Sequence, residues 1–455
     1  MLPLFIQQQR RFKPVETAKN VLGKVSRYRW IVLIVLWLVY IINYFDRIAV
    51  LTFLPLIRSD LGLTAAQAGL GASLFFFAYA IAQFTGGWLA DRIGPKKVMY
   101  IAITTFTAVT FVTGFIRNFT HFILVRLGLG FFEGHHFSPS HKAIANWFPK
   151  VEKGRAAGFF STSWAVGPAI IPIIITWVAA FYGSWRPVFF WLAVPGIIGI
   201  LLLWYFVADK PEEMVRRGRM TQAEADYIEA GVVSESVKGD SKGGLTVVAR
   251  DVYFWMYCIV LFMNLAIYWG STTWISSFLY EQHGFSLKTM GALVSLPYAV
   301  AFVAMILGGW LTDNVFKNKT RPVLLISYLV SIPVLLYIGM IPKGNVSMIV
   351  AMLALMGFFV NLSFGAVYAY PQIRYPREVV GSAVGISNGF GQFGSFVAPL
   401  IAGYLVVEKA GGGASYTNVF IFFSAMAVIA AVLTLFLSEK PLTATLPKSE
   451  STVKA

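Results

Sequence analysis

The chain has 455 residues, of which 57% are hydrophobic and 13% are charged, and its formal net charge is +16. Water-soluble proteins carry roughly 25% charged residues, so this composition excludes a soluble domain and favours a protein embedded in a lipid bilayer. The positive charge does not indicate a nucleic-acid partner, because lysine and arginine gather beside alternate apolar stretches, as the positive-inside rule describes.

Apolar stretches long enough to span ~30 Å of hydrocarbon recur along the whole chain. We therefore expect an all-α membrane protein of twelve transmembrane helices in two six-helix bundles, with both termini in the cytoplasm. The expected helices cover residues 30–57, 66–90, 97–116, 120–147, 155–182, 187–207, 253–280, 288–312, 322–341, 346–371, 382–407 and 417–437. The expected parts of the chain are a basic tail (1–29), a first bundle (30–207), a cytoplasmic linker (208–252), a second bundle (253–437) and a C-terminal tail (438–455).

The first expected helix carries an acid and a base near its centre, in the sequence "NYFDR" that ends at Arg47. Charges at that depth are costly, so they are usually functional and paired. The planar fork of Arg47 fits a substrate carboxylate, although a structural ion pair with Glu133 is the alternative. Asp46 and Arg47 point about 100° apart and need separate partners. Arg126 and Glu133 are the expected partners, in a pairing that the sequence leaves open.

The fourth expected helix contains most of the remaining ionisable residues. Arg126 and Glu133 lie seven residues apart, on one face and about 10 Å apart along the helix axis. In the following stretch "GHHFSPSH", His136 lies about 60° from Glu133 on a helical wheel and His135 about 200° away. We therefore expect His135 to be a packing or interfacial residue. His141 lies eight residues beyond Glu133 and is a candidate for a functional role.

The two halves of the chain resemble each other. The stretch "GGWLADRIGPKK" (86–97) recurs as "GGWLTDNVFKNK" (308–319), and residues 130–149 align without a gap to residues 357–376. A repeat of six plus six helices is typical of transporters whose bundles rock about a central site. In the second half, Asn388 and Gln392 lie one turn apart among glycines, and such polar amides in an apolar helix usually form hydrogen bonds.

Several of these motifs resemble those of a known family. "GGWLADRIGPKK" resembles the loop signature of the major facilitator superfamily, and "GFFSTSWAVGP" (158–168) resembles its antiporter-type motif in partial form. "NYFDR", "RLGLGFFEG" and "NWFPKVEKGRAAG" resemble the anion:cation symporter family, which includes bacterial hexonate, hexuronate and aromatic-acid importers and the animal sialin and vesicular glutamate carriers. The resemblance implies proton-driven symport of an organic carboxylate across a bacterial inner membrane.

The resemblance also implies roles for individual residues. Asp46 and Glu133 are then protonation sites, and the spacing of His141 is one at which vesicular glutamate carriers also place a histidine. Asn264 lies near the position of an arginine in those carriers, and the missing charge disfavours glutamate as substrate. The expected substrate contacts are Tyr44, Arg47, Tyr79, Gln83, Arg126, His136, Asn264, Asn388 and Gln392. We expect Asp91, Arg92 and Arg155 to form a cytoplasmic latch between the bundles.

The sequence leaves the direction of transport and the identity of the anion open. The alternative function is a proton antiporter that exports amphipathic or aromatic compounds, while a non-transporting sensor lacks a soluble output domain. The expected partners are a small organic anion, protons and the lipid bilayer, and the chain is expected to be a monomer. No cofactor or metal is expected, because the proton gradient supplies the energy. The anion could be a sugar acid, an aromatic acid or a dicarboxylate.

Overall fold

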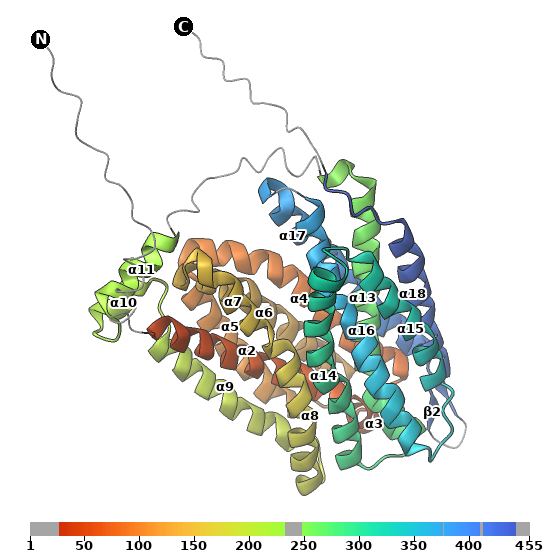
Figure 1. Ribbon diagram of the computed structural model, residues 1–455. Helices are drawn as coiled ribbons and strands as arrows, with labels where there is room; N and C mark the ends of the chain where they lie inside the picture. Colours follow the sequence, from red (N-terminus) through yellow and green to blue (C-terminus); the bar gives the residue numbers. More distant parts are fainter. Residues whose placement is uncertain (1–26, 233–247, 376, 410–412, 443–455) are drawn as a thin grey trace, which may run out of the picture.

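The computed structural model describes residues 27–232, 248–375, 377–409 and 413–442, and this part of the chain is almost entirely helical (Figure 1). The first bundle runs from red to green in Figure 1. Its helices are α2 (Tyr28–Thr52), α3 (Leu54–Asp60), α4 (Ala65–Ile93), α5 (Pro95–Thr113), α6 (Phe119–Trp147), α7 (Lys150–Ser161), α8 (Ser163–Tyr182) and α9 (Arg186–Phe206).

The second bundle lies beside the first and runs from green to blue in Figure 1. Its helices are α13 (Val252–Ser277), which continues into η2 (Phe278–Gln282), α14 (Leu287–Trp310), which continues into η3 (Leu311–Val315), α15 (Arg321–Ile338), α16 (Val346–Arg374), α17 (Arg377–Leu405) and α18 (Thr417–Phe436). Two short antiparallel strands, β1 (Val407–Glu408) and β2 (Ala414–Ser415), form a ribbon between α17 and α18.

Within the described residues, nine helices are long and apolar enough to cross a membrane. Helices α5, α6 and α17 are more polar. With them, and with α7 and α8 counted as one, each bundle has six membrane helices among the described residues. The fifth expected helix is divided at Thr162 into α7 and α8. The first is divided at Phe53, and α3 carries Pro55 in its first turn, where a proline needs no hydrogen-bonded N–H.

Part of the expected linker folds into two short helices, α10 (Pro211–Arg216) and α11 (Gln222–Val232). The Glu224 carboxylate of α11 accepts hydrogen bonds from the backbone N–H groups of Tyr28 and Arg29, which open α2. Arg29 also forms ion pairs with Glu224 and with Glu152 of α7. This segment is therefore docked on the first bundle. The rest of the linker (233–247) and most of both expected tails lie outside the described residues.

The repeat seen in the sequence is also a repeat of packing. A Cβ atom added at Gly130 of α6 would lie 2.1 Å from the Phe75 carbonyl oxygen of α4. One added at Gly357 of α16, the matching position, would lie 2.5 Å from the Pro297 carbonyl oxygen of α14. Only glycine permits such close helix contact. Both bundles thus pack their second and fourth helices through equivalent glycines.

The two bundles meet on the side that carries α3 and the β1–β2 ribbon, here called the ribbon side. There, a Cβ atom at Gly69 of α4 would lie 2.7 Å from the Pro399 carbonyl oxygen of α17. The Ser276 hydroxyl of α13 donates to the Leu51 carbonyl of α2. Near the start of α14, Gly291 makes a similarly close contact with the first bundle at α8.

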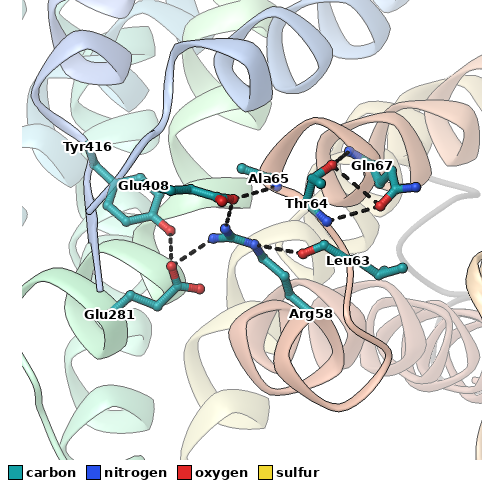
Figure 2. Close-up of polar contacts among 8 residues, drawn as sticks. All are labelled: Arg58, Leu63, Thr64, Ala65, Gln67, Glu281, Glu408 and Tyr416. Carbon is teal, nitrogen blue, oxygen red and sulfur yellow. Dashed lines mark hydrogen bonds and ion pairs between the residues drawn. The ribbon is translucent and has the colours of Figure 1, made fainter. Parts of the chain in front are cut away.

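A polar network joins the bundles at the same place (Figure 2). Arg58 of α3 donates to the Glu281 carboxylate of η2, with 2.8 Å between Nη1 and Oε2, and also pairs with Glu408 of β1. The Tyr416 hydroxyl donates to Glu281, and Glu408 accepts from the Ala65 N–H that opens α4. One cation of the first bundle thus lies between two acids of the second.

On the opposite side, here called the linker side, the matching glycines of the repeat are free of contacts. Cβ atoms added at Gly154 and Gly158 of α7, or at Gly381 and Gly385 of α17, would have no heavy atom of another helix within 4 Å. In the described part of the chain, the bundles are therefore closed against each other on the ribbon side and apart on the linker side.

Candidate functional site

A cavity lies between the two bundles. Helices α2, α4, α6 and α8 line it from the first bundle, and α13, α14, α16 and α17 line it from the second. Among these helices, α4 contacts α17, α8 contacts α14 and α2 contacts α13 across the interface between the bundles. Any relative motion of the bundles therefore changes access to this cavity.

Aromatic side chains form more than half of the described lining. The first bundle contributes Tyr40, Tyr44, Phe76, Tyr79, Phe137 and Trp164. The second contributes Tyr268, Trp269, Tyr298, Phe364 and Tyr368. Of these rings, only Tyr44 and Tyr79 were predicted as site residues. The others were missed because an aromatic residue in a membrane helix faces lipid as readily as a cavity.

Arg47 is the charged residue of the described lining, and aromatic rings surround its guanidinium. The guanidinium carbon lies 4.5 Å from the ring centre of Tyr79, 4.8 Å from that of Phe75 and 5.4 Å from that of Trp269. Such contacts favour a cation over a ring face. Trp269 belongs to the second bundle, so the cation lies where the two bundles meet.

Glu133 of α6 holds Arg47 from behind the cavity. Its Oε2 atom accepts from Nη2 of Arg47 at 3.0 Å and from Nε at 3.3 Å. The carboxylate is fully buried, and its Oε1 atom has no hydrogen-bond partner within the described structure. Gly130 and Gly134, on either side of Glu133 in the sequence, bring α6 close against α4.

Asp46 lies on a different face of α2 from Arg47, as its position in the sequence predicts. Its side chain is buried, is not part of the cavity lining and lies beside the Thr110 hydroxyl of α5. The ion pairs found among the described residues do not include Asp46. The sequence left the pairing of Asp46 and Arg47 open, and the structure joins Arg47 to Glu133.

The structure does not bring Arg126 to the cavity. Its Nε atom donates to the Gly71 carbonyl at 3.2 Å and Nη2 to the Ala72 carbonyl at 3.4 Å, both on α4. Its guanidinium lies 4.4 Å from the ring centre of Phe75, on which Arg47 also lies. The Arg126 side chain is therefore enclosed between α4 and α6. It lies two helical turns from Glu133, toward the ribbon side.

Three of the four predicted amides line the cavity, namely Gln83, Asn388 and Gln392. Asn264 does not, because it accepts hydrogen bonds from the hydroxyls of Tyr328 and Ser363 inside the second bundle.

Asn361 lines the cavity and was missed. The sequence contained a signal for it, because the repeat aligns Asn361 with the residue after Glu133.

The three histidines that follow Glu133 in α6 have different surroundings. His136 is fully buried against the ring of Tyr40 and does not line the cavity. His141 packs among aromatic rings, and its Nε2 atom has no partner in the described part of the chain. His135 bonds the Thr85 hydroxyl at 2.8 Å and a carbonyl of its own helix, and so packs α6 on α4.

The predicted latch residues lie at the linker side and contact their own bundle. Asp91 pairs with Lys142 of α6. The Arg92 guanidinium lies 4.0 Å from the ring centre of Trp88, and Arg155 lies over an aromatic ring of α2. In the described structure these residues make no ion pair with the second bundle, as expected where the bundles are apart.

Two sets of six helices, built on an internal repeat and enclosing a cavity at their interface, define a membrane transporter rather than an enzyme. The family model described as the Major Facilitator Superfamily matches residues 36–399 and 318–454. The chain belongs to this superfamily, within its anion:cation symporter-type family, and is an integral membrane protein.

Curated relatives match over nearly their whole length. A probable sulfoacetate transporter of Cupriavidus necator is 31% identical over 90% of this chain and 94% of its own. A hexuronate transporter of Bacillus subtilis is 27% identical over 88% and 92%, and a D-galactonate transporter of Escherichia coli is 27% identical over 90% and 95%.

Solved structures share the fold at low sequence identity. A bacterial homologue of the human lysosomal transporter spinster, in an inward-facing form, has a TM-score of 0.76 at 18% identity and covers 92% of this chain and 100% of its own. The xylose transporter XylE of Escherichia coli has a TM-score of 0.68 at 15% identity over 90% and 99%.

Proposed function

We propose that the chain is a proton-coupled symporter that takes up a small organic anion, such as a sugar acid or another carboxylate, across a bacterial inner membrane. The observation that carries the proposal is Arg47, a permanent cation that faces the cavity while Glu133 holds it from behind. The names of the curated relatives, which transport sulfoacetate, hexuronate and galactonate, support an organic anion as substrate.

The Arg47–Glu133 pair offers a coupling step. Nε and Nη2 of Arg47 both donate to one oxygen of Glu133, so the donors that suit a substrate carboxylate are engaged by the protein. Protonation of Glu133 would remove the negative charge that holds the guanidinium and free these donors for the anion. Proton and anion would then bind together, as symport requires.

Asp46 and His141 are the further groups that we assign to proton coupling. Asp46 is buried one residue from Arg47, and His141 has an unpartnered ring nitrogen on the helix of Glu133. Alternating access would follow when the bundles separate on the ribbon side and close on the linker side. Both termini and the linker would then lie in the cytoplasm, consistent with the distribution of basic residues.

The test separates substrate binding from proton coupling. Counterflow needs binding and rocking but no net proton flux, so we expect Asp46→Asn and Glu133→Gln to retain counterflow and lose uphill, proton-driven accumulation. Glu229→Gln, at an exposed acid of α11, is the matched control and should behave as the wild type. Uphill accumulation by both Asp46→Asn and Glu133→Gln would contradict the proposal. Proton-driven movement of the compound out of the cell would favour the exporter instead.

A further inference from the structure

The charges at the cavity suit a substrate with one anionic group. Arg47 is the charged side chain in the described lining, and Glu133 already balances it. Arg126 is also buried, but it is enclosed behind Phe75, and two of its nitrogens donate to carbonyls of α4. A dianion would therefore leave one negative charge without a cationic partner in a largely apolar cavity, which is strongly unfavourable.

The walls next to this cation suit a flat apolar body. Tyr44, Tyr79 and Trp269 contact the Arg47 guanidinium and also line the cavity, so the rings continue from the cation along the walls. A carboxylate bound to Arg47 would hold the body attached to it between these rings. Aromatic rings pack on such walls with a specific geometry, in addition to the burial of apolar surface.

Amide side chains are a minor part of this lining, and two of the four are engaged within the protein. The Asn361 side chain donates to the Gly357 carbonyl at 2.8 Å, and the Asn388 amide accepts from Tyr368. Gln83 and Gln392 also line the cavity, but rings form more than half of the described lining. A polyhydroxylated body would lose a hydration shell on entering the cavity and meet ring faces over most of the walls.

Trp164 of α8 is a free donor at this cavity. Its indole Nε1–H is buried and has no hydrogen-bond partner within the described residues, although the side chain lines the cavity. Buried N–H groups are nearly always hydrogen-bonded, so an unpartnered one at a ligand cavity indicates a place for a ligand acceptor. One neutral hydroxyl or carbonyl on the substrate body would satisfy it.

We propose that the substrate is an aromatic monocarboxylate with one neutral polar substituent, and that Trp164 is a specificity-determining residue that contacts its body. This inference rests on the proposed function, since it takes the cavity as the transport site. Among the organic anions that the proposed function allows, it ranks aromatic monocarboxylates ahead of diacids and sugar acids.

Two matched pairs of compounds test the charge and the body separately. 4-Hydroxybenzoate carries a para hydroxyl where terephthalate carries a second carboxylate. Gluconate and glucarate are the corresponding monoacid and diacid with a polyhydroxylated chain. We expect 4-hydroxybenzoate to bind the purified protein most tightly in a thermal-shift titration, because bound ligand stabilises the folded state. Terephthalate should bind at least about tenfold more weakly, because its second carboxylate would be buried without a cationic partner.

Equal or tighter binding of either diacid would overturn the assignment of a monoanion. Tighter binding of gluconate than of 4-hydroxybenzoate, or no binding of the aromatic acid at millimolar concentration, would overturn the assignment of an aromatic body. Proton-driven uptake of gluconate or glucarate would leave the proposed function standing, so the two failures are distinguishable.

A pair of tryptophan variants tests the residue assignment. Trp164→Leu should weaken binding of 4-hydroxybenzoate about tenfold or more, because it removes a wall ring and its free donor. Trp204→Leu changes a side chain of α9 that is 60% exposed, and this variant should bind as the wild type does. Both variants are compared after confirming equal melting temperatures without ligand. Equal affinity of the two variants would remove Trp164 from the site.

Discussion

Arg47 is held by its shape as much as by its charge. Two of its nitrogens donate to a single oxygen of Glu133, while the rings of Tyr44, Phe75, Tyr79 and Trp269 surround the planar group. A planar, delocalised cation stacks on rings and forms paired hydrogen bonds in a way that a compact ammonium group does not. The side chain that this site requires is therefore arginine in particular, rather than any cation.

We accordingly expect Arg47→Lys to impair binding nearly as much as Arg47→Ala. Loss of one charged hydrogen bond costs about 1.5–3 kcal/mol, which corresponds to a fall in affinity of about 10- to 100-fold. Binding or counterflow of the transported anion measures the effect, and Arg117→Lys, at an exposed loop position, is the control. An unchanged affinity in Arg47→Lys would exclude Arg47 from substrate contact.

For individual residues, the sequence predicts the charged pair of Arg47 and Glu133 better than the rest of the site. Arg47 and Glu133 stand out because a charge in an apolar helix is rare and needs a partner. The enclosure of Arg126 could not be predicted, because it depends on carbonyls of α4 that a neighbouring helix exposes. The cavity rings Tyr268 and Trp269 were missed because apolar helices give no sequence signal for which face is turned from lipid.

Helix contacts in this protein depend on where glycine permits them. Gly130 and Gly128 lie on the same helix, but their surroundings differ. A Cβ atom at Gly130 would lie 2.1 Å from the Phe75 carbonyl oxygen, whereas one at Gly128 would lie 3.5 Å from a methyl group of Val109. The first is a steric overlap with rigid backbone, and the second is an ordinary van der Waals contact.

We expect Gly130→Ala to destabilise the protein by about 1–3 kcal/mol, because α4 and α6 must move apart. The same displacement separates Glu133 from Arg47, so transport should fall as well. Gly128→Ala should leave both stability and transport close to wild type. Melting temperatures in detergent and uptake rates of the two variants measure the difference, and similar values for both would show that α4 and α6 are not packed as described.

A second element-scale contact joins the start of α13 to the end of α16. Burial by itself would raise the pKa of the Asp251 carboxyl, but hydrogen bonds from Arg374 and Tyr375 outweigh burial and hold that pKa below its usual range. A carboxyl with a lowered pKa in the folded state stabilises the fold above its unfolded pKa, which is about 3.9 for aspartate. This stabilisation is lost as the pH falls through the lowered value.

Asp251→Asn should therefore melt at a lower temperature than the wild type at neutral pH. The difference should narrow below about pH 4, where the wild-type carboxylate becomes protonated and loses the same interactions. Melting curves at several pH values, with Asp313→Asn as an exposed control, check this expectation. A constant difference across the pH range would mean that the ionised carboxylate is not what stabilises this contact.

Apolar length and the repeat predict the membrane helices well, since a span of hydrocarbon fixes the length of each. The break at Thr162 between α7 and α8 was not predicted, because no proline or glycine marks that residue. The docking of α11 was also not predicted. It depends on Glu224 reaching the N–H groups that open α2, a contact between residues far apart in the sequence.

The molecule as a whole is closed on the ribbon side and open on the linker side. Arg58 connects the bundles on the ribbon side, whereas Arg186 on that side pairs with Asp60 of its own bundle. An ion pair between the bundles stabilises only the state in which they touch, so its loss shifts the equilibrium between states. Arg58→Gln should therefore populate the state open on the ribbon side, and Arg186→Gln should not.

The single cysteine makes this shift measurable. In a Cys258→Ser background, Ala301→Cys places a reporter thiol in the cavity lining. We expect an impermeant maleimide added from the ribbon side to label it several-fold faster in Arg58→Gln than in the parent or in Arg186→Gln. Equal labelling rates in all three proteins would show that the Arg58 network does not hold the bundles together.

The network around Arg58 also has a consequence for the moment after it breaks. Arg58 departs with α3, while Glu281 and Glu408 stay on the second bundle, so breaking the network leaves a freed cation on the first bundle and two freed acids on the second. An anion arriving from bulk water is attracted to the freed Arg58 and repelled by the freed acids. Arg58 therefore draws the anion toward the bundle that also carries Arg47, and salt weakens this local attraction by screening it.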